Sequence, residues 1–516
     1  MAQPSAAHTV EHDKRLFWGC FIALVSTSFG FIARVLTAPQ WGAEFGLTET
    51  QVGEILGAGL WPFAISIVLF SLVIDKIGYK AAMWFGLLCH TLSTVIILFA
   101  RDYSMMYLGT FVLALGSGTV EAYANPVVAT VFSREKTRWL NYLHAGWPGG
   151  LVFGGILAIS LGDLYWKYKI AIILIPTVVY AVMLAVQKFP IHERVAAGVS
   201  YRDMLREVGA LGALIAAAMV IMQVGQIFQW SMTFNLLLIA LATGAYAFYT
   251  RSLGRPLFIL MLLIMIPLAT TELGVDSWIT TLMSGEMTRI GINAGWVLIY
   301  TSAIMMTLRF FAGSIVHRIS PLGLLAVSAA IAAVGLFFLS SATGAMILIA
   351  ATLYGIGKSF FWPTSLGVVA EQFPRGGALT LNVVGGVGML AVGVIGAPFM
   401  GLLQDRNMDE NLALAAPALH SQVMVQRNSI FGDYQAVDPA VAATVPAGDQ
   451  QTLGQVQEQS QKEALRTIAF LPVLMLVFYI ALILYFRSRG GYRPVSIEET
   501  AARDPDVAVR TAATQA

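Results

Sequence analysis

Residues 116–155 read GSGTVEAYANPVVATVFSREKTRWLNYLHAGWPGGLVFGG, and the organisation of the chain can be worked out from this stretch. It holds two apolar segments around a basic loop, and the first segment contains Glu121. A carboxylate in lipid costs roughly 2 to 3 kcal/mol on insertion scales, so it normally faces an interior cavity. Glu121 is therefore a functional candidate. The pair Asn125-Pro126 interrupts helical hydrogen bonding nearby, and the glycines between 146 and 155 permit close helix contact.

The composition is that of a polytopic membrane protein. Of 516 residues, 57% are hydrophobic and only 12% are charged, against about 25% charged in soluble proteins. The net charge of +2 gives no basic excess that would suggest a nucleic-acid partner. The two cysteines, Cys20 and Cys89, lie in apolar runs and predict neither a disulfide nor a metal site.

The apolar runs are long enough to cross about 30 Å of hydrocarbon. Two groups of six are separated by a further pair, which predicts an all-α membrane protein of fourteen transmembrane helices with an inserted hairpin. The first run is too long for a cleaved signal peptide and is expected to remain as a helix. The runs are 16–38, 51–74, 81–100, 105–132, 141–162 and 168–187, then 209–228 and 232–250, then 257–283, 292–316, 321–341, 345–371, 378–404 and 466–487.

The distribution of Lys and Arg predicts the orientation. With an even number of spans both termini share a side, and the loops on that side carry most of the basic residues, which places them in the cytoplasm of a cell (inner) membrane protein. The predicted parts are an N-terminal half, a linker with the hairpin, a C-terminal half whose loop 405–464 faces outward, and a cytoplasmic tail. Within that loop QTLGQVQEQSQKEALRT is a candidate surface helix. The boundaries of the four parts are 1–190, 191–256, 257–490 and 491–516.

The two groups of six form an internal repeat. SLVIDKIGYK, from Ser71, is matched by GSIVHRIS, from Gly313, at an offset of 242 residues, and the segment around Asn141 is matched by that around Asn382. Two related halves of six helices in the same orientation are the arrangement of major facilitator transporters, which bind substrate at the midplane between the halves.

DKIGYK resembles the loop motif of the major facilitator superfamily, although Ser71 stands where that family prefers Gly. Within the superfamily, EAYANP and LNYLHAGWPGG resemble signatures of the fucose/glucose/galactose proton-symporter group. The resemblance implies that Glu121 is the coupling carboxylate and that Asn125 and Asn141 are polar pocket residues. TTELGVDSWITTLM likewise resembles the seventh helix of related glucose carriers.

Charged and aromatic side chains in the apolar runs supply the other candidates. Glu272 and Asp276 join Glu121 as candidate proton-coupling carboxylates, and structural ion pairing is the alternative interpretation for each buried charge. Arg34 and Asp276 are related by the same offset of 242 and lie at similar depth, which predicts an ion pair, with Glu272 as alternate partner of Arg34. Arg309, near the end of its run, is predicted to be structural. The candidate substrate-binding residues are Arg34, Asn125, Asn141, His144, Trp147, Trp278, Lys358 and Trp362.

A cytoplasmic gate is expected at the loop motif. The charges of Asp75, Lys76, Lys80 and Arg134 lie at the ends of helices on the predicted inner side and favour a conformational latch over a substrate site.

The sequence therefore predicts a secondary active transporter that moves a small polar organic solute, most simply a sugar, with a proton or sodium ion. No nucleotide-binding loop of the GxxxxGK type occurs, so an ion gradient is the expected energy source. No cofactor or metal is expected, the bilayer is the surrounding partner, and a monomer is expected. A carrier of organic anions or drug-like solutes, with Arg34 and Lys358 as anion contacts, and a non-transporting membrane sensor or membrane-embedded enzyme are the alternatives; an enzyme is disfavoured because no nucleophile, metal cluster or soluble catalytic domain is visible.

Overall fold

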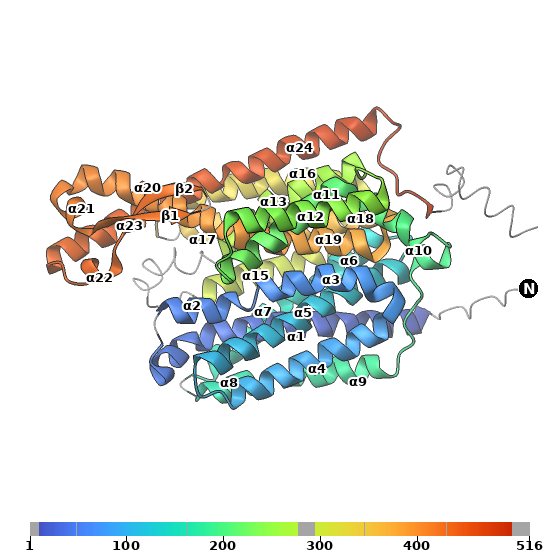
Figure 1. Ribbon diagram of the computed structural model, residues 1–516, viewed down its shortest axis with the longest axis horizontal. Helices are drawn as coiled ribbons and strands as arrows, with labels where there is room; N and C mark the ends of the chain where they lie inside the picture. Colours follow the sequence, from blue (N-terminus) through green and yellow to red (C-terminus); the bar gives the residue numbers. More distant parts are fainter. Residues whose placement is uncertain are drawn as a thin grey trace, which may run out of the picture.

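The computed structural model describes residues 10–47, 49–162, 164–276, 291, 295–344, 346–429 and 431–497. It is a bundle of long helices that run roughly parallel to one axis (Figure 1). Thirteen helices in the described residues are long and apolar enough to cross a membrane. The remaining predicted span, 292–316, corresponds to α15 and the first turns of α16, where a bend at Ser320 (φ 66°) separates it from the next span. The predicted all-α membrane fold is confirmed.

The N-terminal half supplies six spans, three of which are divided into two elements. Pro126 lies inside α5 without ending it, so the predicted interruption of helical hydrogen bonding does not break that helix. The elements are α1 Val10–Phe45, α2 Glu49–Gly57, α3 Trp61–Ile77, α4 Tyr79–Leu98, α5 Tyr103–Val131, α6 Lys136–His144, α7 Gly146–Ser160, α8 Trp166–Ala171 and α9 Leu174–Ala185.

The linker contains a short helix and the inserted hairpin. The hairpin packs through α11 against α13 and α19, whereas α12 packs mainly on α11 and is otherwise exposed. It therefore lies at the periphery of the bundle, beside the C-terminal half. The elements are α10 Glu193–Ala196, α11 Tyr201–Ile227 and α12 Met232–Thr250.

The C-terminal half repeats the six-span arrangement and carries a π-helical turn in two of its spans. One of these turns, η1, contains Glu272, and such turns are frequent at functional sites. The elements are α13 Pro256–Ala269, η1 Thr270–Gly274, α15 Gly295–Arg309, α16 Ala312–Leu339, α17 Met346–Lys358, α18 Phe361–Gln372, η2 Pro374–Gly376, α19 Gly377–Ala391, η3 Val392–Gly396 and α24 Phe470–Arg487.

Residues 397–468 form a projection at the end of the bundle opposite the described termini (Figure 1), and its base, with Met400, Leu465 and Ile468, packs into an apolar cluster of the C-terminal half. The projection has its own apolar cluster, which includes Met408, Leu412, Val423 and Leu453. The predicted surface helix of this segment is present as α23. The elements are α20 Ala397–Ala415, α21 Pro417–Val423, the antiparallel pair β1 Met424–Ser429 and β2 Gly432–Val437, α22 Pro439–Ala442 and α23 Ala447–Ile468.

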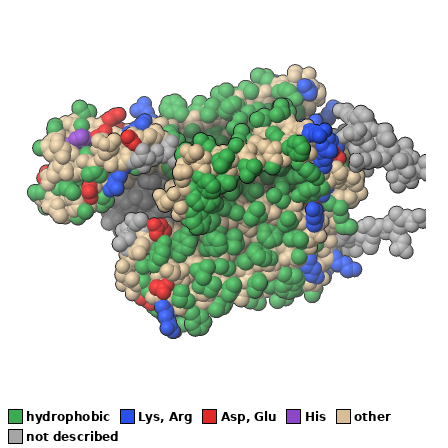
Figure 2. All heavy atoms as spheres, viewed as in Figure 1, with side chains coloured by type: hydrophobic (Ala, Val, Ile, Leu, Met, Phe, Trp, Pro, Cys, Tyr) green, Lys and Arg blue, Asp and Glu red, His purple; other side chains and the backbone are tan. Residues whose placement is uncertain are grey.

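The two halves contact each other through α3 with α19, α6 with α18, and α7 with α15. Within the N-terminal half, glycine lets α7 approach α1 closely: a Cβ on Gly150 would lie 2.0 Å from Ser28 Oγ, far inside van der Waals contact. The expected close packing of the glycine-rich segment is therefore present. Side chains on the visible face are mostly apolar, while Lys and Arg gather at the end that carries the termini (Figure 2). We call that end the inner end.

Candidate functional site

A small cavity lies between the two halves, and we call it the central cavity. The space open to the centre of a water molecule is about 20 Å³, which is room for one or two waters. Three charged side chains, one histidine and five apolar side chains contribute to its wall. It is lined by Phe63, Glu121, His144, Trp147, Glu272, Leu273, Arg309, Trp362 and Met389.

Glu121 projects from α5 and is only 5% exposed. Asn125, one helical turn further along, donates from Nδ2 to Glu121 Oε2 at 3.2 Å. His144, the last residue of α6, lies with Nε2 2.9 Å from Asn125 Oδ1, and Nε2 is the donor because an amide oxygen can only accept. Within the described part of the chain no Lys or Arg forms an ion pair with Glu121. The alternative interpretation of Glu121, structural ion pairing, is therefore not realised.

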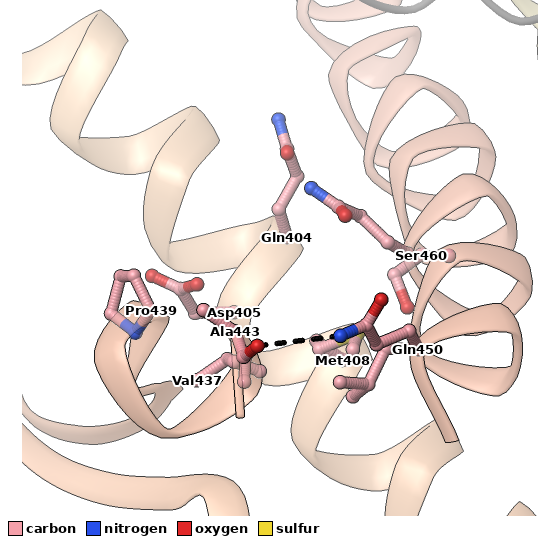
Figure 3. A pocket seen from close by; sticks show the side chains of 12 residues that line it. Gln404, Asp405, Met408, Val437, Pro439, Ala443, Gln450 and Ser460 are labelled. Carbon is pink, nitrogen blue, oxygen red and sulfur yellow. Dashed lines mark hydrogen bonds between the residues drawn. The ribbon is translucent and has the colours of Figure 1, made fainter. Parts of the chain in front are cut away.

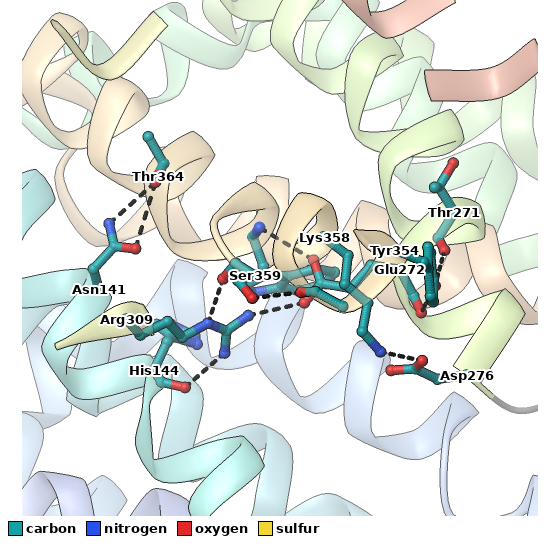
Figure 4. A network of polar contacts seen from close by, with 12 residues as sticks. Asn141, His144, Thr271, Glu272, Asp276, Arg309, Tyr354, Lys358, Ser359 and Thr364 are labelled. Carbon is teal, nitrogen blue, oxygen red and sulfur yellow. Dashed lines mark hydrogen bonds and ion pairs between the residues drawn. The ribbon is translucent and has the colours of Figure 1, made fainter. Parts of the chain in front are cut away.

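Arg309, which the sequence predicts to be structural, lies at the wall of the central cavity and forms a buried ion pair there. Its Nη2 donates to Glu272 Oε1 at 2.9 Å, and both side chains are buried. Its Nη1 donates to the carbonyl of His144 at 2.7 Å and its Nε to the carbonyl of Ser359 at 2.7 Å (Figure 4). Arg309 and Glu272 belong to the C-terminal half and His144 to the N-terminal half, so this guanidinium joins the halves. The position of Arg309 near the end of an apolar run did not indicate that it would line the cavity or which residue it would pair with.

Lys358 forms the second ion pair, with Asp276 (Figure 4). The ammonium group also lies 5.0 Å from the centre of the Tyr354 ring, and the Tyr354 hydroxyl donates to the carbonyl of Thr271 at 2.6 Å. Lys358 is fully buried. Of the two interpretations left open for it, pocket residue or ion pair, the structure shows the pair.

The predicted pair of Arg34 with Asp276 is wrong, and so is Glu272 as the alternate partner of Arg34. Equal depth in two related helices does not make their side chains face each other, and Lys358 lies nearer to Asp276. Arg34 is 4% exposed. Its Nε donates to the carbonyl of Gly30 at 3.0 Å, while Nη1 has no hydrogen-bond partner among the described residues.

The repeated asparagines lie at the contact between the halves. Asn141 Nδ2 donates to Thr364 Oγ1 at 3.1 Å across the contact of α6 with α18. Asn382 Nδ2 donates to the carbonyl of Ala122 at 3.0 Å, joining α19 to α5. Each asparagine therefore ties its own half to the other one. Trp147 and Trp362 line the cavity as expected, whereas Trp278 lies outside the described residues.

The four predicted gate residues do not bridge the halves in the described structure. Asp75 pairs with Arg194 in α10 at 2.5 Å, and Lys76 lies 4.6 Å from the ring centre of Tyr201 in α11. Lys80 reaches the carbonyl of Gln187 at 3.5 Å, and Arg134 is exposed. The loop motif therefore fastens the linker to the N-terminal half. Among the described residues these four side chains form no hydrogen bond or ion pair with the C-terminal half, and their role as a conformational latch stays a prediction.

The inner end is closed by other residues, centred on Glu371 of α18. Its Oε1 accepts from the backbone N of Thr137 at 3.2 Å and from Thr137 Oγ1 at 2.5 Å. Its Oε2 accepts from the Tyr492 hydroxyl at 2.7 Å. Lys136 extends the contact, donating to the carbonyl of Ala370 at 3.3 Å and to Glu193 at 2.7 Å. The only sequence signal was the position of Glu371 at the end of an apolar run.

The comparisons with known proteins agree with this architecture. The family model of the Major Facilitator Superfamily matches residues 19–397. The L-fucose-proton symporter of Escherichia coli is 30% identical over 128 residues, which cover 24% of this chain and 28% of that protein. The gentisate transporter of Corynebacterium glutamicum is 26% identical over 141 residues, which cover 26% of this chain and 32% of that one. The matched stretches thus span less than a third of these relatives.

A crystal structure of the Escherichia coli fucose:proton symporter superposes with a TM-score of 0.57 at 17% identity, covering 90% of this chain and 98% of the symporter. The chain belongs to the Major Facilitator Superfamily. It is a membrane transporter and not an enzyme.

Proposed function

We propose that the chain is a proton-coupled symporter of a small, uncharged, polar organic solute, with a sugar as the substrate class. The observation that carries the proposal is Glu121, a buried carboxylate at the wall of a cavity between the halves. It accepts a hydrogen bond from Asn125 and forms no ion pair with any described residue. An unpaired carboxylate of this kind can bind and release a proton as the cavity opens to one side and then the other.

A chain of hydrogen bonds from Glu121 through Asn125 to His144 connects the site of this proton to the contact between the two halves. His144 carries the carbonyl that accepts from Arg309, and Arg309 is held by Glu272. A proton on Glu121 turns one of its oxygens into a donor and removes the negative charge, so the hydrogen bond from the Asn125 amide to the other oxygen weakens. We infer that this change reaches the Arg309 contact between the halves and favours the alternation of access.

The ion pairs favour an uncharged substrate. Arg309 is neutralised by Glu272, and Lys358 by Asp276, so neither cation is available to an anionic solute without breaking a buried pair, which is costly. In this proposal Glu272 and Asp276 hold cations in place, and Glu121 alone carries the coupled proton. Trp147 and Trp362 offer flat apolar faces to a sugar ring.

A carrier of organic anions is the second candidate. Arg34 is a buried guanidinium that forms no ion pair among the residues that the structure describes, and a carboxylate is its natural ligand. The gentisate transporter is also among the similar proteins, at 26% identity against 30% for the fucose symporter. A substrate that reaches the outer part of α1 would meet this charge.

We further propose that the protein lies in the cell membrane with both termini in the cytoplasm. The inner end carries the concentration of Lys and Arg (Figure 2), and basic residues are retained on the cytoplasmic side.

Uptake by purified protein in proteoliposomes tests the function. Radiolabelled L-fucose, myo-inositol and gentisate are offered in turn with an inward proton gradient, an inward sodium gradient or no gradient. Accumulation of a neutral solute that requires the proton gradient supports the proposal. Accumulation of gentisate alone supports the anion carrier, and a sodium requirement removes the proton from the mechanism.

A further inference from the structure

The projection formed by residues 397–468 contains a cleft of about 570 Å³, far larger than the central cavity. We call it the outer cleft. Gln404 and Asp405 lie on one side of it and Gln450 and Ser460 on the other (Figure 3). It is lined by Gln404, Asp405, Met408, Val437, Pro439, Ala442, Ala443, Gln450, Leu453, Gly454, Gln457 and Ser460.

The two long walls of the outer cleft continue two helices of the transporter. α20 begins at Ala397, directly after the turn η3 that ends α19, and α23 runs into α24 across the single residue Ala469. The cleft is therefore attached to the C-terminal half by helical segments, without a long flexible linker on either side. A ligand that changes the angle between α20 and α23 would act on α19 and α24.

The polar groups of the cleft suit a ligand that both donates and accepts hydrogen bonds without net charge. Gln404 and Gln457 each offer an amide oxygen and an amide nitrogen. Gln450 offers its amide oxygen, because its nitrogen already donates to the carbonyls of Ala443 and Val445. Ser460 Oγ already accepts from Asn411 Nδ2 at 3.2 Å, so its own hydrogen is available to donate. Met408 and Leu453 supply an apolar surface between these groups. No Lys, Arg or His is among the described residues that line the cleft.

Asp405 is the one charged group in the wall. It is partly buried, and its carboxylate has no hydrogen bond or ion pair with another described residue, although the charge of Arg427 partly offsets it. A carboxylate accepts two hydrogen bonds side by side, which matches two neighbouring hydroxyl groups. The offset by Arg427 makes the cleft less suited to a cation than a lone carboxylate would be.

Gly454 leaves the middle of the cleft open. It lies on α23 one turn from Gln450 and one turn from Gln457, so all three share a face of the helix. A Cβ at Gly454 would meet nothing within 4 Å, so a larger side chain there extends into free space. Glycine in a helix interior is unfavourable by about 1 kcal/mol, and its replacement should not weaken α23.

We propose that the outer cleft is a second binding site, for a small, uncharged, hydroxyl-rich solute such as a sugar or polyol. The site is distinct from the central cavity and does not depend on the function proposed for it. The bound solute would lie at the end of the molecule opposite the described termini, between the two helices that continue α19 and α24.

Protection of an introduced cysteine from alkylation tests the site in the full-length protein. Ala443→Cys places a thiol in the cleft, and Gly448→Cys places one at an exposed position of α23 outside it. The native Cys20 and Cys89 are buried and free, so they give little background. The probes are myo-inositol and L-fucose, with choline and gentisate as charged comparisons. With a Kd of about 10 mM, about 50 mM solute slows alkylation about sixfold, because the protection factor is one plus the ratio of concentration to Kd.

We expect myo-inositol or L-fucose to slow labelling of Ala443→Cys about sixfold and to leave Gly448→Cys unchanged. Adding Gly454→Leu should abolish the protection, whereas adding Gly448→Leu to Ala443→Cys should preserve it. Protection by choline or gentisate alone would overturn the assignment of ligand class. Absence of protection by every probe, or protection that survives Gly454→Leu, would overturn the site itself. None of these readouts requires transport, so a failed uptake assay leaves the result interpretable.

Discussion

Neutralising either member of the Arg309–Glu272 pair should damage the protein more than neutralising both. The two side chains are 2% and 4% exposed and are joined at 2.9 Å. Removing one partner of such a pair leaves an uncompensated buried charge, at a cost of about 3 to 5 kcal/mol. Arg309→Met also removes the donors to the carbonyls of His144 and Ser359, at about 1 kcal/mol each. Arg309→Met is therefore expected to be the worse single variant, ahead of Glu272→Gln.

The double variant removes both charges, so its loss should fall short of the sum of the single losses by at least about 2 kcal/mol. The assay is unfolding of the purified protein in mixed micelles by increasing SDS, followed by circular dichroism. Arg206 and Asp203 give a matched control, because they are 38% and 17% exposed and three residues apart on α11, where coupling of about 0.5 kcal/mol is expected. Additive losses at Arg309 and Glu272 would refute the reasoning.

Three further predictions follow from the contacts described. Arg34→Met and Asp276→Asn should have additive effects on stability, within about 0.5 kcal/mol, because the two side chains are not paired. Unfolding of the single and double variants measures this additivity. Strong coupling between the two variants would show that Arg34 and Asp276 do form an ion pair. Glu371→Ala should speed amide hydrogen exchange at the inner ends of α6 and α18 at least about tenfold, since it removes hydrogen bonds to a carboxylate worth about 1.5 to 3 kcal/mol each; unchanged exchange would show that Glu371 does not hold the halves together. A cysteine at Gly448 should react with an impermeant reagent on intact cells and one at Gly491 should not, and the reverse labelling would invert the proposed orientation.

Much of the fold could be predicted because hydrophobic length is a strong signal. Runs that span the bilayer, interrupted by short polar segments, can form only helices in lipid. The repeat at an offset of 242 residues then divided these helices into halves. The projection was harder, because an amphipathic polar segment such as 447–468 indicates a helix without indicating what it packs on.

Individual residues of the site were predictable where the membrane itself makes them unusual. Glu121 stands out since a carboxylate near the middle of an apolar run is costly, and Asn125 follows one turn later on the same face. Lys358 was conspicuous for the same reason. The ion-pair partner of Lys358 could not be predicted, because pairing depends on the rotation and tilt of neighbouring helices. The spacing of residues along one helix gives neither the rotation nor the tilt.

Arg309 shows the limit most clearly. Its position near the end of an apolar run predicted a structural role and did not place it at the central cavity. The structure instead directs the guanidinium inward to Glu272 and to the backbone of the other half. The same limit applies to the predicted gate residues. Their charges could be read from the loop motif, but their contacts with α10 and α11 depend on where the linker lies.

The most direct test of the account is Glu121→Gln, because glutamine keeps the shape and hydrogen bonding of the side chain and cannot bind the coupled proton. The measurement compares uphill accumulation driven by a proton gradient with exchange between equal solute concentrations on both sides of a proteoliposome. Glu207→Gln is the matched control, since Glu207 is also buried but is paired with Arg255 outside the central cavity. The account predicts that Glu121→Gln loses accumulation and keeps exchange, while the control keeps both. Unchanged proton-driven accumulation in Glu121→Gln would contradict it.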